Sequence, residues 1–221
     1  MVNEVLNVNE EKQFPMEMHE CNSTDQLDLE ILLELGNIGA GKATTALSEM
    51  VNERIEVEVP RLHLSPPHLV PRIFGKHDAL MAIVHMELTE EPDCDVLLIF
   101  DVDEARKIAA MMNMCTVEEL DPEMENSAIE ELGNIMIGGF LSAISDFTSM
   151  ELVPRPPQLV KGSFDAVLDT FLVKQALTSD MALVFDGCFK RSGSEAGGTI
   201  VVFPSKEMQK ILIEKGREWI G

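Results

Sequence analysis

The chain has 221 residues and a formal net charge of −22 at pH 7. That length is sufficient for one large domain or two small ones with a buried core. The charge argues against binding to nucleic acid or anionic lipid, because no segment has the excess of Lys and Arg that neutralises phosphates. A saline cytoplasm and a need for solubility are both compatible with it. No apolar run is long enough to span a bilayer or to serve as a secretory signal, so we expect a cytoplasmic protein.

The first half of the chain begins with a polar, acidic segment, residues 1–24, which we expect to be a flexible leader. Helical periodicity and N-cap residues predict a long helix over residues 25–50. The rest of this half is expected to contain a half-buried strand, a Pro-rich loop, two buried strands and a helix with acidic residues at its start. In order, these are residues 54–60, the loop with Pro66, Pro67 and Pro71, and residues 79–87, 95–100 and 101–112.

The second half repeats this order. A second long helix is predicted over residues 121–147, with Pro122 in its first turn. A strand, further β segments and a closing helix are expected after it, with Gly193 and Gly197–Gly198 in a hairpin turn. These elements are residues 151–160, then 167–176, 181–190 and 198–203, and finally 205–217.

A short motif occurs twice, as Glu34-Leu-Gly-Asn37-Ile and as Glu131-Leu-Gly-Asn134-Ile. A proline follows each copy, and the Glu, Asn and Pro of the two copies are all 97 positions apart. The common register indicates an internal duplication. We therefore predict a single α+β domain over residues 25–221 with internal pseudo-twofold symmetry, made of repeats at about 25–115 and 121–221. Strands of both repeats join one sheet, and the two long helices expose their E-x-x-N pairs. The prolines are Pro60 and Pro157.

The polar residues of each copy fall on one stripe of their helix. Ser127, Glu131 and Asn134 are spaced i, i+4, i+7, with apolar residues on the opposite side. In the first copy the same stripe consists of Glu30, Glu34 and Asn37, and the residues behind it are Leu32, Leu35, Gly39, Ala43, Ala46 and Met50. A solvated face is the simpler interpretation of one copy alone. Two copies favour a function, because a merely soluble face does not require the same pair twice.

A second motif overlaps the first copy. Residues 36–44 nearly satisfy the phosphate-binding pattern G-x-x-x-x-G-K-[ST], but Ala43 precedes the hydroxyl residue. A phosphate-binding loop requires a buried strand before its first glycine, whereas this segment follows a helical pattern. Nucleotide binding therefore remains a minor alternative.

The pattern Asp/Ser-x3-Glu-x2-Asn-x22-Pro resembles the signature of the CheC/CheX/FliY family, and two copies point to the CheC type within it. Ser127, Glu131, Asn134 and Pro157 match all four positions, whereas Glu30 departs from the pattern in the first copy. The resemblance implies a phosphatase that removes the aspartyl phosphate of a CheY-type chemotaxis response regulator.

The resemblance also implies a role for each residue. Asn37 and Asn134 would orient the attacking water, while Glu34 and Glu131 would engage a lysine of the regulator. Glu30 and Ser127 are candidate supports, and Pro60 and Pro157 are expected to shape strand ends. Magnesium would arrive with the regulator. No metal or cofactor of the chain's own is predicted, since the four cysteines are scattered and no paired histidines accompany them.

An alternative of another class is a non-catalytic adaptor of the flagellar switch. A related fold occurs in the middle domain of the switch protein FliM, and CheC-type proteins also bind CheD, a receptor-modifying deamidase. An adaptor gives no reason to expose both carboxamides, so the E-x-x-N pairs favour the phosphatase. Regulation of CheD and catalysis are compatible with each other.

Overall fold

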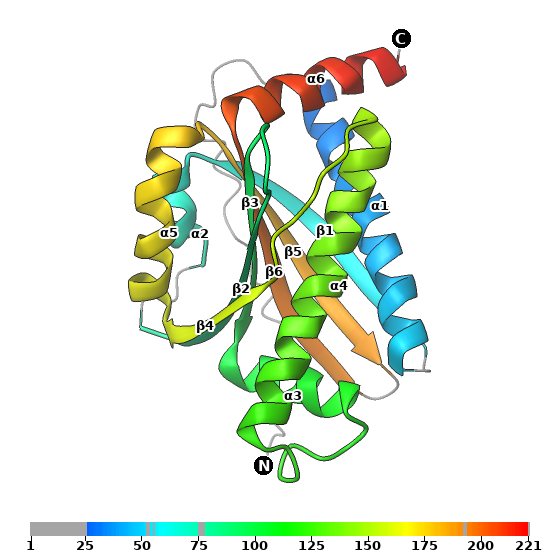
Figure 1. Cartoon of the computed structure of the whole chain (residues 1–221), viewed down its shortest axis with the longest axis vertical. Coiled ribbons are helices and arrows are strands. Elements are labelled where there is room, and N and C mark those ends of the chain that lie inside the picture. Colours follow the sequence, from blue (N-terminus) through cyan, green and yellow to red (C-terminus); the bar gives the residue numbers. More distant parts are fainter. Residues whose placement is uncertain (1–25, 52–53, 55, 75–77, 192–193, 221) are drawn as a thin grey trace, which may run out of the picture.

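The computed structural model describes residues 26–51, 54, 56–74, 78–191 and 194–220. The predicted leader and the turn glycine Gly193 lie outside these residues. In the part described, a six-stranded sheet lies between two layers of helices (Figure 1). No helix in this part of the chain is both long and apolar enough to cross a membrane.

The strand order is β1-β5-β6-β3-β2-β4, and every pairing is antiparallel. Exchanging β1 with β4, β2 with β5 and β3 with β6 gives the same order in reverse. Strands of both halves are therefore intermixed in one sheet, as two repeats about a pseudo-twofold axis would place them, although the duplication itself stays a prediction. The strands are β1 (Glu56–Ser65), β2 (Leu80–Glu87), β3 (Cys94–Asp101), β4 (Gln158–Ser163), β5 (Ala182–Arg191) and β6 (Ser194–Pro204).

Helices cover both faces of the sheet. One face packs against the two long helices together with α3 and α6, and the other packs against α2 and α5. Figure 1 shows α1 and α4 lying antiparallel on one side of the sheet and α5 with α2 on the other. The helices are α1 (Gln26–Val51), α2 (Val70–Phe74) after a 3-10 turn (Pro67–Leu69), α3 (Val102–Met112), α4 (Pro122–Thr148), α5 (Phe164–Thr178) and α6 (Lys206–Ile220).

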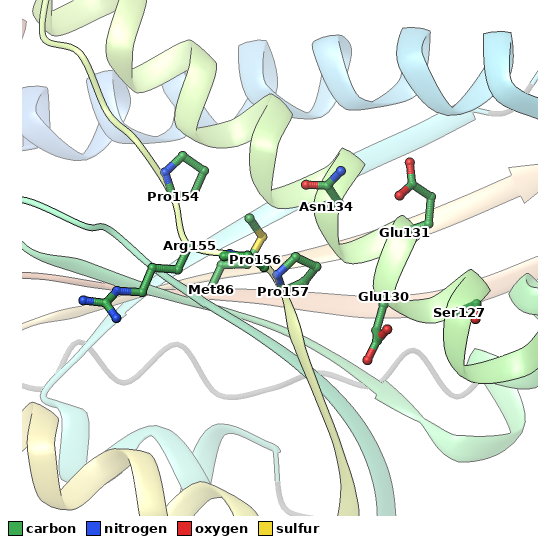
Figure 2. Close-up of a pocket in the computed structure, with 9 residues that line it drawn as sticks. All are labelled: Met86, Ser127, Glu130, Glu131, Asn134, Pro154, Arg155, Pro156 and Pro157. Atoms are coloured by element: carbon green, nitrogen blue, oxygen red, sulfur yellow. The ribbon is translucent and has the colours of Figure 1, made fainter. Parts of the chain in front are cut away.

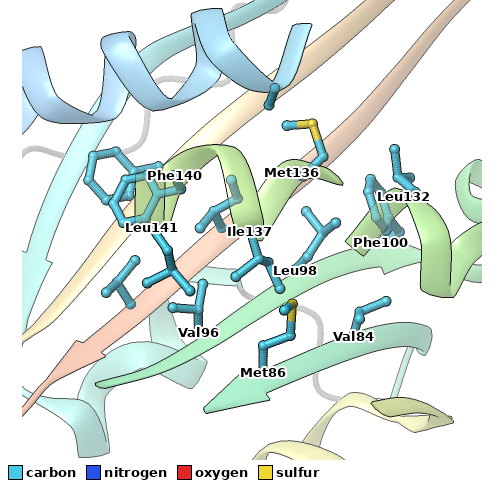
Figure 3. Close-up of a cluster of buried hydrophobic side chains, with 14 of the residues drawn as sticks. Val84, Met86, Val96, Leu98, Phe100, Leu132, Met136, Ile137, Phe140 and Leu141 are labelled. Atoms are coloured by element: carbon cyan, nitrogen blue, oxygen red, sulfur yellow. The ribbon is translucent and has the colours of Figure 1, made fainter. Parts of the chain in front are cut away.

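The larger core lies between the sheet and the long helices. Alternate residues of β2 point to it, while Met81 and Ile83 point to the opposite core. Because both faces are covered, β3 is buried at seven of its eight positions. Figure 3 shows the side chains of β2, β3 and α4 that meet in the larger core: Val84, Met86, Val96, Leu98, Phe100, Leu132, Met136, Ile137, Phe140 and Leu141.

The two long helices touch through glycine. A Cβ on Gly39 would lie 2.9 Å from the Cα of Phe140, and a Cβ on Gly139 would lie 2.9 Å from the backbone N of Ala43. Glycine costs a helix up to about 1 kcal/mol per residue, which this close approach offsets by allowing the backbones to pack. Lys42 of α1 also donates to Ser142 Oγ of α4 at 3.0 Å and pairs with Asp146. The contact holds the apolar sides inward and leaves the polar stripes outside.

One predicted element has the wrong type. Residues 167–176 were expected to be β structure, but they lie in helix α5. Its β-branched residues favoured a strand, whereas the side chains that pack on the second core are spaced i, i+3, i+4, i+7, i+8. These residues are Phe164, Val167, Leu168, Phe171 and Leu172.

Other differences concern boundaries. The strand predicted at residues 151–160 is wrong over most of its length, since β4 begins only at Gln158. β1 continues past Pro60 to Ser65, and the Pro-rich segment after it folds into the 3-10 turn and α2 rather than a loop. The turn glycine pair lies inside β6 instead. At the end of α1, Ala46 and Met50 are exposed, whereas they were expected behind the stripe.

Candidate functional site

Helix α4 presents the second copy of the motif. Its N-cap is Asp121, whose side chain accepts from the backbone N–H groups of Glu123 and Met124, each at 2.9 Å. Ser127, Glu131 and Asn134 are all exposed, as their spacing predicts, while Ala128, Ile129, Leu132 and Gly133 between them are buried. The helix therefore holds the carboxylate and the carboxamide on its outer side.

The glycine inside each E-L-G-N motif marks where the helix meets the sheet. A Cβ on Gly133 would collide with Val84 of β2, and a Cβ on Gly36 would collide with Phe185 of β5. β2 and β5 occupy equivalent places in the symmetric strand order. In both copies the glycine lets the helix pack closely on a strand one residue before the exposed Asn.

The four signature residues of the second copy gather around one hollow of about 490 Å³. Figure 2 shows α4 on one side of it and the segment before β4 on the other. The lining residues are Met86, Ser127, Glu130, Glu131, Asn134, Pro154, Arg155, Pro156 and Pro157. The hollow thus brings together Asn134 of α4 and Pro157, which lies directly before β4.

An irregular strand edge borders this hollow. The ladder between β2 and β4 ends at His85 and Gln158 and resumes where the backbone N–H of Arg155 donates to Glu87 O at 2.8 Å. Pro156 and Pro157, in the interval, have no N–H to donate to the ladder. A bridge joins the next residues, Leu88 and Pro154, so the β4 side has one residue more than β2 over this interval. The resulting bulge leaves Met86 facing the hollow.

The first copy has the same helical stripe, since Glu30, Glu34 and Asn37 are all exposed on α1. Its proline, Pro60, lies in β1, and its side chain is outside the described residues. The register of β1 against β5 shifts between Glu58 and Arg61, so this strand also gains a residue there. β1 and β4 are the two edges of the sheet. Pro60 therefore lies at a bulge in the edge strand β1, and Pro157 lies directly before the edge strand β4, where the ladder with β2 is interrupted.

Glu131 and Asn134 are available for an external partner. Within the described part of the chain, neither side chain takes part in a hydrogen bond or ion pair. Glu125, two turns earlier on α4, contrasts with them, since it is buried and pairs with Lys161 of β4. Glu125 therefore stabilises the fold, while Glu131 of the motif faces solvent.

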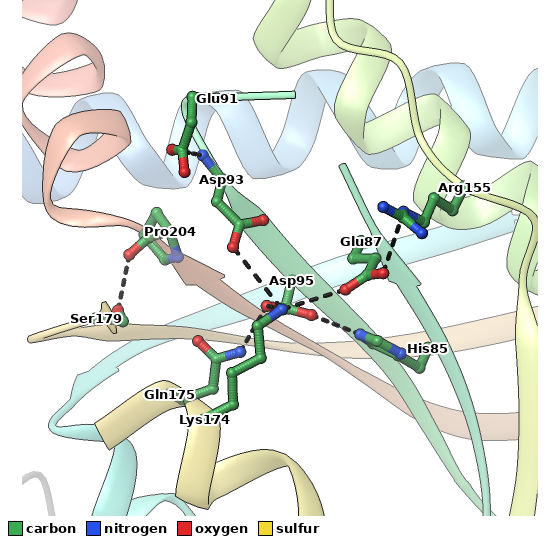
Figure 4. A network of polar contacts seen from close by, with 10 residues as sticks. All are labelled: His85, Glu87, Glu91, Asp93, Asp95, Arg155, Lys174, Gln175, Ser179 and Pro204. Atoms are coloured by element: carbon green, nitrogen blue, oxygen red, sulfur yellow. Dashed lines mark hydrogen bonds and ion pairs between the residues drawn. The ribbon is translucent and has the colours of Figure 1, made fainter. Parts of the chain in front are cut away.

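A network of charges adjoins the hollow, and no sequence pattern predicted it (Figure 4). Arg155 Nε lies 3.2 Å from Glu87 Oε1, and Lys174 Nζ lies 3.2 Å from Glu87 Oε2 and 2.9 Å from Asp95 Oδ2. Asp95 is buried and also contacts His85 and Gln175, both at 2.6 Å. Burial alone would raise the pKa of Asp95, but the hydrogen bonds from His85, Lys174 and Gln175 lower it below its usual value.

Three members of this network have the chemistry of metal ligands. One ligand atom each of His85, Glu87 and Asp95 lies within 4.8 Å of the others. The ammonium group of Lys174 already contacts both carboxylates, so it supplies the positive charge there. The group is therefore explained as an ion-pair network that ties α5 to β2 and β3.

Residues 36–44 do not form the phosphate-binding loop on which the alternative of nucleotide binding depended. Residues 36–44 are helical throughout and lie in the middle of α1, whereas a phosphate-binding loop requires a loop before a helix N-terminus. Lys42, the residue that would reach a phosphate, contacts α4 through Ser142 and Asp146.

The fold is shared with two solved structures, FliY and the FliM middle domain. The structure resembles FliY of Thermotoga maritima with a TM-score of 0.72 and 21% identity, covering 89% of this chain and 99% of that one. It also resembles the FliM middle domain of H. pylori, with a TM-score of 0.64 and 10% identity over 87% of this chain and 99% of that one. At these identities the similarity establishes the fold alone.

Sequence comparison shows similarity to one family. The model of the CheC-like family matches residues 29–64 and 124–160, and each matched segment contains one E-x-x-N pair with its proline. The chain is 28% identical to the CheY-P phosphatase CheC of Bacillus subtilis (strain 168), over 75% of this chain and 81% of that protein. It is 25% identical to the putative CheY-P phosphatase CheC1 of Halobacterium salinarum, over 81% of this chain and 91% of that protein. The predicted resemblance to the CheC-like family is confirmed.

Proposed function

We propose that this protein hydrolyses the aspartyl phosphate of a CheY-type chemotaxis response regulator. The observation that carries the proposal is the convergence of Ser127, Glu131, Asn134 and Pro157 on one hollow, with the Glu and Asn side chains exposed. The relatives named as CheY-P phosphatases support the same reaction.

Asn134, and Asn37 in the first copy, would position the attacking water. An acyl phosphate already has a good leaving group, so a helper needs chiefly to hold a water in line with the scissile P–O bond. A carboxamide suits this task because it both accepts and donates a hydrogen bond. Neither stripe has a Cys, His or Lys beside the Asn, so the mechanism requires no covalent intermediate on this chain.

Glu131 and Glu34 would anchor the regulator by pairing with a lysine at its phosphorylation site. The magnesium ion that neutralises the phosphoryl oxygens would come with the regulator. Ser127 and Glu30 would support the anchor from the preceding turn of each stripe. In this scheme the regulator brings the charged groups and this protein adds the water-positioning amide.

The direct test is release of inorganic phosphate from a labelled, phosphorylated CheY-type regulator in magnesium buffer. We expect this protein to accelerate release at substoichiometric concentration while no label appears on its own chain. A rate equal to that of the regulator alone would exclude the phosphatase, and label on this chain would exclude the direct mechanism.

The similarity to the FliM middle domain favours a second candidate, a non-catalytic adaptor of the flagellar switch. An adaptor would bind the regulator without shortening the lifetime of its phosphoryl group, so the same assay separates the two functions. A CheD-type deamidase as a further partner stays a prediction from the family resemblance, compatible with either function.

A further inference from the structure

Arg155 is a cationic residue on the lining of an otherwise acidic site. Its side chain is 57% exposed, and it shares the hollow with Glu130, Glu131 and Asn134. Figure 2 shows its guanidinium group projecting from the segment before β4, on the side away from Ser127. On a chain with a net charge of −22, a cation at this place is unexpected from composition alone.

The fold holds Arg155 in place from two directions. Its backbone N–H donates to Glu87 O at 2.8 Å, and its Nε lies 3.2 Å from Glu87 Oε1. Glu87 is fixed in turn by Lys174, which contacts the buried Asp95. A guanidinium has five N–H donors, and the contact at Nε uses one of them. The alternating charges therefore preorganise the group while leaving donor capacity for a partner.

The first copy of the motif lacks this cation. At the same 97-residue offset that relates the two motifs, the counterpart of Arg155 is Glu58 in β1. The first copy also has Glu30 where the second has Ser127. Both copies therefore contain the E-x-x-N pair, but the charges of the residues beside it differ. Arg155 belongs to the second site alone and is not part of the repeated motif.

We propose that Arg155 contacts acidic side chains on the rim of the regulator's phosphorylation site and makes the second copy the preferred docking site. This inference rests on the proposed function. A site that receives a magnesium-binding, phosphorylated partner faces an excess of negative charge, which Glu130 would otherwise repel. Arg155 attracts the regulator at the edge of the contact, where a charge changes the rate of association more than the rate of hydrolysis.

The test combines Arg155→Gln with variants that silence one site. Asn37→Ala leaves only the second site active, and Asn134→Ala leaves only the first. In the Asn37→Ala background we expect Arg155→Gln to raise KM about fivefold with kcat within about twofold, and to flatten the salt dependence of KM. In the Asn134→Ala background the same change should leave KM unaltered. Arg155→Lys should recover most of the loss, because it restores the charge.

Arg72 provides the matched control. It is exposed on α2, on the opposite face of the sheet, so Arg72→Gln removes the same charge far from the hollow. We expect its KM to equal that of the parent. Equal KM values for Arg155→Gln and Arg72→Gln in the Asn37→Ala background would overturn the inference while leaving the phosphatase intact.

Binding separates this inference from the proposed function. The probe is the CheY-type regulator held in its phosphorylated form by beryllofluoride and magnesium, titrated against each variant without turnover. Weaker binding by Arg155→Gln, about fivefold, supports the contact even if the parent fails to hydrolyse phosphate. Unchanged binding by this variant, or no binding by the parent, overturns it.

Discussion

The two copies of the motif lie on neighbouring antiparallel helices, yet their surroundings differ. On α4, Glu131 and Asn134 border a hollow with Ser127, Arg155 and Pro157. On α1 the stripe is equally exposed, but its first residue is Glu30, and Glu58 stands at the offset of Arg155. A helix alone is therefore enough to expose the Glu and Asn of each copy, whereas the charges beside them differ because Arg155 comes from the segment before β4 and Glu58 from β1.

The first prediction concerns which of the two sites contributes more to the dephosphorylation rate. Asn134→Ala should lower the dephosphorylation rate about tenfold and Asn37→Ala by only about a tenth, because Glu30 adds a second negative charge beside Glu34 and the second site supplies most of the rate. Both substitutions place the better helix former at an exposed position, so the thermal midpoint should change little. Single-turnover decay of the labelled regulator measures each rate. Equal losses from the two variants would show that the surroundings do not matter.

The charge network beside the second site can be broken at its buried end. Asp95→Asn removes the carboxylate that Lys174, Gln175 and His85 contact, leaving the lysine without its buried partner. We expect the free energy of unfolding at pH 7 to fall by about 3 kcal/mol in urea titrations. Equal stability of variant and parent at pH 7 would show that the network does not hold β3 to α5.

The stability lost in Asp95→Asn should decrease as the pH falls. The folded-state pKa of Asp95 is lowered from its usual 3.8, so the stability from its charge is present above that pH. It is lost as the pH falls below 3.8 through the folded-state pKa. The gap between parent and Asp95→Asn should therefore be constant between pH 5 and pH 7 and narrow below about pH 4. A gap that widens with acid would contradict the direction of the shift.

The glycine of the motif offers a smaller test with a control on the same helix. Gly133→Ala should destabilise the protein by about 2 kcal/mol, because the new methyl group collides with Val84. Gly138→Ala meets no atom within 4 Å and should stabilise it by about 0.5–1 kcal/mol. Thermal unfolding of the two variants gives both values. Equal stability of the two variants would mean that the helix is not in close contact with β2.

A small gain in rate is expected when the first copy of the motif is given the serine that the second copy has. In the Asn134→Ala background, Glu30→Ser restores the signature residue at the first stripe and should raise the residual rate about twofold. Glu49→Ser, on an exposed residue of the same helix, removes the same charge and should not. A decrease after Glu30→Ser would mean that the acid supports the first site rather than repelling the partner.

Hydrophobic periodicity correctly predicted most of the elements that bury one face or both faces. The long helices α1 and α4, strands β2 and β3, and helices α3 and α6 are confirmed within a few residues. α5 was predicted wrongly because Val167, Thr170 and Val173 favour strands locally, while packing on the second core selects a helix. A local preference was overridden by the need to cover the far face of the sheet.

The polar stripes were predictable because the helix alone fixes them, and their exposure is confirmed. The role of each residue stays a prediction. The hollow was not predictable, since it forms where two prolines interrupt a ladder between strands distant in the sequence. The contacts of Arg155 were not predictable for the same reason. Only the fold brings it into contact with Glu87, which Lys174 links to Asp95.

In the proposed function, the exposed carboxamides of α1 and α4 accelerate hydrolysis of the regulator's phosphoryl group. The most direct measurement compares the parent with the Asn37→Ala, Asn134→Ala double variant in the decay of a labelled, phosphorylated CheY-type regulator. We predict that the double variant leaves decay at the rate of the regulator alone, with a thermal midpoint close to that of the parent. A folded double variant that dephosphorylates the regulator as fast as the parent would contradict the account, and the stripes would then be solvated faces of an adaptor.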